Sequence, residues 1–213
     1  MASDIRVKIC GIRTAACVAV AVQSGASYLG FNFFSKSPRS LTLSEAADLT
    51  AGVPAGVAKV GLVVDPDDAG LDALLAAVPL DMIQLHGREP PERVAEVKAR
   101  AGLPVMKAVG VGTDADLPAL DAFGRVADQL LVDAKPAPGS ELPGGNGVAF
   151  DWRLIAGRRW NCPWMLAGGL TPENVAEAVR LTGARQVDVA SGVESAPGVK
   201  DPDLIRAFLK AVV

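Results

Sequence analysis

A cysteine and an aspartate, Cys10 and Asp133, end two short apolar runs of the 213-residue chain. Val7 and Ile9 are β-branched and apolar, which indicates a short buried strand that ends at Cys10. A thiolate accepts a proton well and a carboxylic acid donates one, so the pair could act as base and acid on a small substrate between them. The plainer alternative is that Cys10 is a small buried hydrophobe and Asp133 caps a loop.

Two glycine-containing turns, Gly168-Gly169 and Ser191-Gly192, follow two further apolar runs. Backbone N–H groups bind a phosphate dianion when no Cβ blocks its approach, and a helix N-terminus adds to the attraction. Two such turns on neighbouring strands predict a phosphate site, and ordinary structural turns are the alternative.

Arg39 and His86 are candidate contacts to the substrate. The planar guanidinium of Arg39, directly after Pro38, suits a carboxylate, although a solvated surface arginine is the alternative. His86 is the only histidine of the chain, which favours a neutral hydrogen-bonding ring over a metal ligand. The three cysteines lack the spacing of a zinc site or a disulfide framework, so we expect no metal.

The elements that must position these residues are short apolar runs alternating with helical patterns. The expected strands are Ile5 to Cys10, Tyr28 to Phe33, Ala58 to Val64, Met82 to Leu85, Val105 to Val109, Gln129 to Val132, Trp164 to Ala167 and Val187 to Ala190. This alternation predicts a parallel sheet with helices outside it. Eight units of about 26 residues favour one domain over residues 1–213, a closed (β/α)8 TIM barrel rather than an open doubly wound sheet.

In a barrel the carboxyl ends of all strands meet at one mouth, where chemistry collects. The strands that end at Cys10 and Asp133 lie three apart around an eight-strand ring, so the two side chains should face each other. Lys8 should share the face of Cys10, because side chains alternate along a strand. The Pro- and Gly-rich stretch Ala134 to Ala149 predicts a functional loop, and Thr171 is expected to cap a helix.

Composition bounds the partners. The formal net charge of −3 and the pI near 5.2 give no basic footprint, so nucleic acid is not expected as a partner. No apolar run reaches membrane-spanning length, and the first residues lack the apolar core of a signal peptide, so we expect a cytoplasmic protein. The oligomeric state stays open between monomer and homodimer.

Eight short motifs together carry a resemblance to one family. They are Lys8-Ile9-Cys10-Gly11, Leu29-Gly30-Phe31, Lys36 to Ser40, Gln84-Leu85-His86-Gly87, Leu131-Val132-Asp133, Gly144 to Gly147 with Phe150-Asp151-Trp152, Leu166 to Leu170 with Pro172 to Val175, and Val187 to Glu194. In this order the chain resembles the phosphoribosylanthranilate isomerases of tryptophan biosynthesis over nearly its whole length. Asn32, polar within a strand, and Asn146, in place of the commoner Thr, are small departures.

The resemblance implies a β/α barrel that rearranges N-(5-phosphoribosyl)anthranilate to the carboxyphenylamino-deoxyribulose phosphate. Cys10 matches the general base of the family and Asp133 its general acid. Arg39 matches the contact to the anthranilate carboxylate, while His86 and Asp188 match polar residues of the same pocket. The phosphorylated substrate is thus the expected small-molecule partner.

The implied reaction is an Amadori rearrangement, for which we expect no metal or redox cofactor because the Schiff base intermediate is itself the electron sink. The acid must be neutral while the thiol is ionised, against their ordinary pKa values. We expect apolar surroundings to favour the protonated form of Asp133, and Lys8 to favour the Cys10 thiolate.

Three rival functions stay open. The related Amadori isomerase of histidine biosynthesis, or a dual-substrate barrel, would carry an aspartate where this chain has Cys10. A metal-dependent phosphosugar epimerase would need more than one histidine. A barrel that binds a phosphometabolite without turning it over is the rival outside enzymes.

Overall fold

The computed structural model describes residues 5–135, 144, 147 and 149–212. Its eight parallel strands form a closed barrel in chain order. They are β1 (Arg6–Cys10), β2 (Tyr28–Asn32), β3 (Ala58–Val63), β4 (Met82–Leu85), β5 (Val105–Val111), β6 (Gln129–Ala134), β7 (Trp164–Leu166) and β8 (Gln186–Val189). The ring closes where β1 pairs with β8, with Lys8 opposite Asp188 in the register. The predicted TIM barrel is confirmed, and each expected strand is present to within two residues at its ends.

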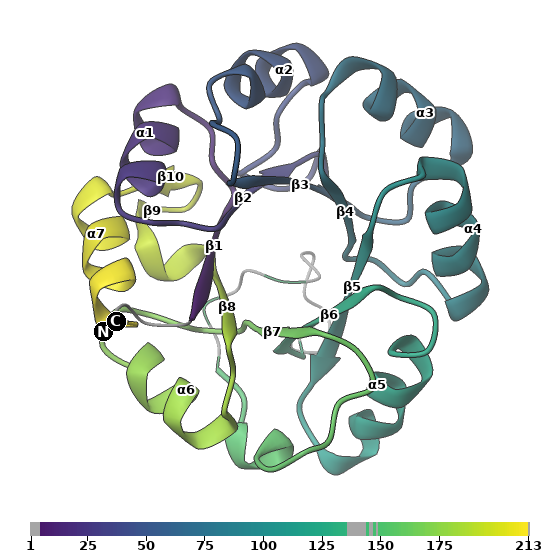
Figure 1. Ribbon diagram of the computed structural model, residues 1–213, viewed down its shortest axis with the longest axis vertical. Helices are drawn as coiled ribbons and strands as arrows, with labels where there is room; N and C mark the ends of the chain where they lie inside the picture. The colour runs from purple at the N-terminus through teal and green to yellow at the C-terminus, as the bar shows by residue number, and fades with distance from the viewer. Residues whose placement is uncertain (1–4, 136–143, 145–146, 148, 213) are drawn as a thin grey trace.

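Helices surround the strand ring, as the view down the barrel in Figure 1 shows. The described α-helices are α1 (Ala15–Gln23), α2 (Leu43–Ala51), α3 (Asp68–Ala77), α4 (Pro91–Ala101), α5 (Leu117–Phe123), α6 (Val175–Thr182) and α7 (Pro202–Ala211). Local sequence explains their ends: Thr42 and Glu45 form a capping box at the start of α2, and Gly102 ends α4 in the left-handed conformation. Short 3-10 turns are η1 (Asp114–Asp116), η2 (Trp152–Ile155) and η3 (Ser191–Val193).

Two layers of apolar side chains follow from strand alternation. Outward-facing strand residues such as Ile9 and Leu29 pack with helix residues such as Phe208, all fully buried. A smaller cluster of strand residues, among them Val60 and Met106, fills the barrel interior. The barrel interior is therefore filled by side chains and is not an open pore.

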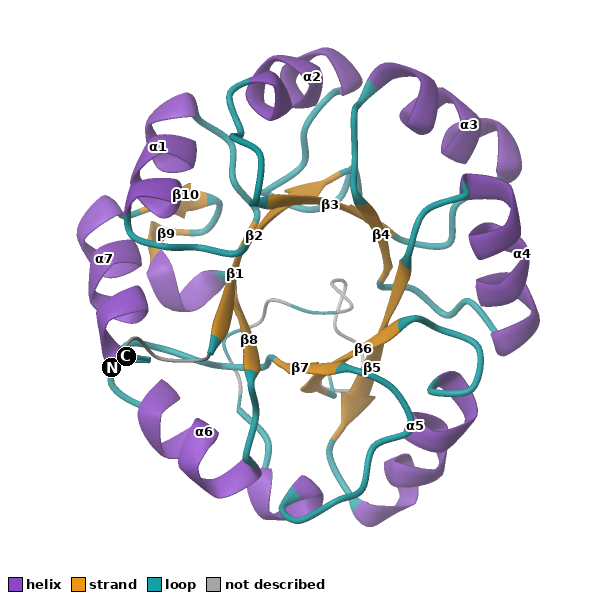
Figure 2. Cartoon of the chain, in the orientation of Figure 1, coloured by secondary structure: helices purple, strands orange, loops and turns teal. Residues whose placement is uncertain are grey.

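Two features differ from the expectations. The helix expected to start after Thr171 begins at Val175, because residues 171–174 form a turn and Asn174 occupies the N-cap position. The hairpin of β9 (Glu194–Ala196) and β10 (Val199–Lys200), which lies beside α1 and α7 in Figure 2, was not predicted from the sequence. Most of the loop predicted over Ala134 to Ala149, Asn146 included, lies outside the described residues.

Candidate active site

Cys10 is the last residue of β1, and its neighbour on the interior face is Lys8. Lys8 is fully buried, and its Nζ lies 2.8 Å from Oδ1 of Asp188 on the adjacent strand β8. A cation, a carboxylate and a thiol thus share one buried corner of the mouth. The predicted alternation that puts Lys8 beside Cys10 is confirmed.

Burial and the charge of Lys8 have opposite effects on the pKa of Cys10. Burial raises the pKa of the Cys10 thiol above its ordinary value, while the charge of Lys8 acts in the opposite direction. Burial also lowers the pKa of Lys8, but the Asp188 carboxylate and Cys10 outweigh burial and raise it to about 12. Lys8 is therefore a permanent cation whose effect on Cys10 has the predicted sign, but burial has the larger effect on the thiol.

Asp133 lies on β6 and meets His86, the residue that directly follows β4. Oδ2 of Asp133 is 3.3 Å from Nε2 of His86, and Oδ1 accepts a hydrogen bond of 2.8 Å from the backbone N–H of Ala134. The apolar surroundings expected for Asp133 are thus wrong in detail, because a strand end exposes backbone and loop polar groups to the carboxyl. Gly144 closes over the pair, since a Cβ there would lie 2.7 Å from Oδ2.

Gln84 on β4 lies two residues before His86 and contacts Nδ1, the ring nitrogen that does not face Asp133. Its Nε2 lies 2.9 Å from Nδ1 of His86, while its Oε1 is buried without a hydrogen-bond partner among the described residues. Gln84 and Asp133 thus contact the two different ring nitrogens of His86. The two contacts together orient the imidazole ring beside the candidate acid.

The two glycine turns proposed for phosphate lie side by side. A Cβ on Gly192 would come within 3.0 Å of the carbonyl carbon of Leu170, so the turn after β8 packs directly on the turn after β7. Gly168 and Gly169 both have positive φ, 83° and 62°, which favours glycine. Asn174 fixes this turn by donating 2.9 Å to the carbonyl of Gly169.

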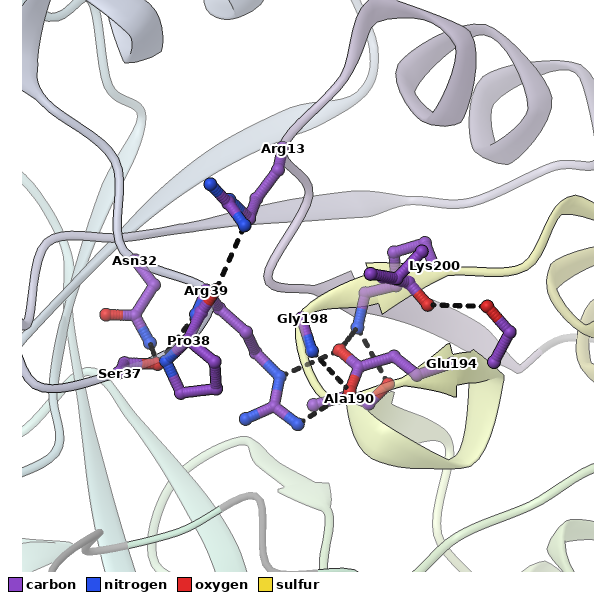
Figure 3. Close-up of polar contacts among 11 residues, drawn as sticks. Arg13, Asn32, Ser37, Pro38, Arg39, Ala190, Glu194, Gly198 and Lys200 are labelled. Carbon is purple, nitrogen blue, oxygen red and sulfur yellow. Dashed lines mark hydrogen bonds and ion pairs between the residues drawn. The ribbon is translucent and has the colours of Figure 1, made fainter.

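Arg39 lies in the loop after β2 and is buried, which excludes the solvated surface arginine. Its backbone N–H donates 3.1 Å to Oγ of Ser37, and that hydroxyl also accepts from the side chain of Asn32. The polar Asn32 at the end of β2 thus helps to shape the loop. Figure 3 shows the Arg39 guanidinium pointing at Glu194, with Nε and Nη2 each 2.8 Å from a carboxylate oxygen.

Sequence reasoning left Glu194, Lys200 and Gln84 without roles. Glu194 and Gln84 stand within the motifs that carried the resemblance, but nothing in their spacing tells which partner they meet. Lys200 follows a Pro-Gly turn, the one local sign of the hairpin that brings it to the site.

Within the described ranges, no helix is both long enough and apolar enough to cross a bilayer. The same residues contain no group of three His, Cys, Asp or Glu side chains arranged to hold a metal ion.

Known proteins match the chain over nearly its full length. Residues 7–211 match the family model described as N-(5'phosphoribosyl)anthranilate (PRA) isomerase. Proteins named N-(5'-phosphoribosyl)anthranilate isomerase are 64% identical over 210 residues in Ruegeria sp. (strain TM1040), covering 98% of each chain, and 68% identical over 205 residues in Paracoccus denitrificans (strain Pd 1222), covering 96% of this chain and 95% of the relative.

Solved structures agree with the sequence match. Phosphoribosyl anthranilate isomerase from Thermotoga maritima superimposes with a TM-score of 0.88 at 36% identity over 98% of both chains. A structure of such an isomerase in complex with reduced 1-(o-carboxyphenylamino)-1-deoxyribulose 5-phosphate gives a TM-score of 0.85 at 34% identity, again over 98% of both chains. The chain belongs to the N-(5'-phosphoribosyl)anthranilate isomerase family.

Proposed function

We propose that this enzyme converts N-(5'-phosphoribosyl)anthranilate to 1-(2-carboxyphenylamino)-1-deoxyribulose 5-phosphate in L-tryptophan biosynthesis, with Cys10 and Asp133 as its catalytic residues. Family membership carries the activity. The observation that supports the residue assignment is the placement of both side chains at carboxyl ends of strands β1 and β6, which are separated by two strands in the ring. A relative binds a reduced form of the product, so the substrate class is a phosphorylated small molecule.

Asp133 is the proposed general acid. As the neutral acid it donates its proton to the furanose ring oxygen, the C1–O bond breaks, and the nitrogen lone pair forms the C1=N bond of a Schiff base. His86 at 3.3 Å supports this role because it can stabilise the carboxylate that Asp133 becomes after donation.

Cys10 is the proposed general base. As thiolate it removes the proton from C2, and the electron pair of that C–H bond moves into the C1–C2 bond of an enolamine. Tautomerisation to the C2 ketone completes the rearrangement, with no net oxidation and no electron acceptor other than the Schiff base. The buried cation Lys8 supports this role because it lowers the cost of a thiolate in a dry site.

The remaining contacts hold the substrate between these two groups. Arg39 is proposed to bind the anthranilate carboxylate, His86 and Asp188 to contact the substrate as polar residues of the same pocket, and the backbone of Gly168-Gly169 and Ser191-Gly192 to bind the phosphate. The contact of the two turns through Gly192 and Leu170 supports a shared phosphate site, because backbone N–H groups from both can converge on one anion.

We further propose that residues 1–213 act as one domain, as a monomer or homodimer. A structural relative is described as monomers generated from a dimeric isomerase, so both states occur in the family. A cytoplasmic location fits a doubly charged phosphate substrate, which does not cross a bilayer unaided.

The test is to mix the protein with freshly made phosphoribosylanthranilate and follow the loss of its fluorescence. Wild type should consume the substrate, whereas Cys10→Ala and Asp133→Asn should lose about 10²–10⁴-fold in kcat and still bind it. Cys162→Ala, half-buried away from the mouth, is the matched control and should retain activity. Binding without turnover in wild type would select a non-catalytic binding barrel, and a tenth of wild-type kcat in Cys10→Ala would remove it as the base.

A further inference from the structure

Glu194 is a buried carboxylate that no step of the proposed mechanism uses. Its two oxygens take Nε and Nη2 of Arg39, both at 2.8 Å, in the parallel geometry that makes arginine–carboxylate pairs strong. The side chains are 7% and 3% exposed for Arg39 and Glu194, so the pair is largely removed from water.

Two further groups donate hydrogen bonds to the carboxylate of Glu194, as Figure 3 shows. Nζ of Lys200 donates 2.7 Å to Oε1, and the backbone N–H of Gly198 donates 3.2 Å to Oε2. Lys200 also donates 2.7 Å to the carbonyl of Ala190. Burial raises the pKa of Glu194, but Arg39 and Lys200 more than offset this and hold the net pKa below its usual value. Glu194 is thus ionised and saturated with donors.

The chain places this carboxylate between the two ends of the proposed substrate site. Glu194 directly follows η3, which contains the phosphate turn Ser191-Gly192. Arg39 lies at the proposed carboxylate end, and the hairpin packs on its loop because a Cβ on Gly198 would lie 2.5 Å from the carbonyl oxygen of Pro38. One side chain therefore joins the two anchoring points through contacts in the described structure.

A long arginine side chain loses rotamer entropy when a single orientation is selected. Two hydrogen bonds to Glu194 fix the plane of the guanidinium before any substrate binds. The entropy loss then occurs when the protein folds and does not weaken substrate binding. Buried ion clusters add little to stability compared with apolar residues of similar size, so orientation is the better explanation for this one.

We propose that Glu194 is a positioning residue that orients Arg39 toward the carboxylate of the substrate and ties it to the phosphate turn. The proposal rests on the proposed carboxylate contact of Arg39. Loss of Glu194 should then weaken recognition of the carboxylate through Arg39, with little effect on the proton transfers at Cys10 and Asp133.

The first test compares Glu194→Gln with the control Glu177→Gln, an exposed glutamate on α6. With phosphoribosylanthranilate, Glu194→Gln should raise KM about ten- to a hundredfold and change kcat far less. With the analogue that lacks the carboxylate, phosphoribosylaniline, Glu194→Gln and wild type should have the same KM. Equal losses on both substrates, or a loss in kcat alone, would overturn the proposal.

A double-mutant cycle with Arg39→Ala tests whether Glu194 acts through Arg39. If it does, Glu194→Gln should cause no further loss in kcat/KM in the Arg39→Ala background, whereas additive losses would overturn the proposal. Glu194→Gln leaves Arg39 and Lys200 as two buried cations that repel each other, and this repulsion can prevent folding. In that case the double variant Glu194→Gln with Lys200→Met, which removes one of the two cations, is put through the same test. Lys200→Met alone is then the reference.

The two proposals fail in different ways. If Arg39→Ala handles both substrates like wild type, the carboxylate contact of Arg39 is wrong and the positioning role falls with it. If Arg39→Ala loses only the carboxylate-bearing substrate while Glu194→Gln behaves like wild type, only the positioning role is wrong.

Discussion

At the residue scale, the chemistry depends on a buried thiol that must give up its proton. Burial raises the pKa of Cys10, and Asp188 raises it further, while Lys8 and Lys200 lower it. The protein thus surrounds its candidate base with two buried cations and still leaves it less acidic than a free thiol. A base of this kind is strong once ionised, which suits removal of a proton from carbon.

The pH dependence of kcat/KM should therefore follow the Cys10 thiolate. Since the pKa of Cys10 lies above its ordinary value, the thiolate fraction and the rate should increase as pH rises toward that pKa. Lys8→Met removes a cation that lowers the pKa, so the rise should move to higher pH, and the control Lys98→Met, with an exposed side chain, should leave it in place.

A second variant checks the sign and the folding. Asp188→Asn removes a charge that raises the pKa of Cys10, so Lys8→Met with Asp188→Asn should move the rise back toward lower pH. The double variant also avoids an unpaired buried carboxylate. A profile that ignores all of these changes would show that another group limits the rate.

At the element scale, function collects where strands end. Cys10, His86 and Asp133 each stand at or near the carboxyl end of a strand, while the phosphate turns follow β7 and β8. Parallel pairing around a closed ring brings these ends together although they are distant in sequence. The backbone of a turn can then act on a ligand as directly as a side chain.

The phosphate turns should depend on backbone shape more than on side chains. Gly169→Val should weaken binding of inorganic phosphate, because a branched Cβ obstructs the turn, whereas Ser191→Ala keeps its N–H and should bind nearly as wild type. Gly102→Val is the matched control, since Gly102 has the same φ of 62° at the end of α4 but no heavy atom within 4 Å of its added Cβ. Calorimetry measures the affinity of inorganic phosphate for wild type and the three variants. Equal affinity in all four proteins would show that the phosphate does not bind at these turns.

At the scale of the whole molecule, a buried ion pair outside the strand ring holds two loops of the mouth together. Lys107 on β5 donates 2.6 Å to Glu89 and 2.8 Å to the carbonyl of Gly87, and Glu89 also accepts from the backbone N–H of Asp65. This network joins the loops after β3 and β4, next to His86. Its side chains are at most 3% exposed, unlike the surface pairs that Arg100 makes with Asp68 and Asp72.

Lys107→Met should therefore lower the free energy of unfolding by about 3–5 kcal/mol, because it leaves the Glu89 charge buried and unpaired. Arg100→Met, which removes the exposed pairs with Asp68 and Asp72, should lower the free energy of unfolding far less, because water screens exposed charges. Urea unfolding followed by circular dichroism measures both. Adding Glu89→Gln to Lys107→Met should recover part of the loss, and equal costs for the buried and exposed pairs would contradict this account.

The sequence by itself determined the barrel and which residues stand at strand ends. Apolar runs of strand length alternate with capped helical patterns in the sequence, and each of these runs forms a strand of the barrel, from β1 to β8. Strand alternation likewise determined that Lys8 and Cys10 share the interior face. The helix start at Val175 was missed because Asn174, rather than Thr171, ends the preceding turn, and both residue types serve as caps.

Only the tertiary structure decided which side chains meet. Asp188 reaches Lys8 across 180 positions, and Glu194 reaches Arg39 across 155, because barrel closure joins the last strand to the first and brings the hairpin beside the loop after β2. The polar surroundings of Asp133 and the net pKa of Cys10 depend on the same contacts. Burial and charge act through space, so no pattern along the chain could give their balance.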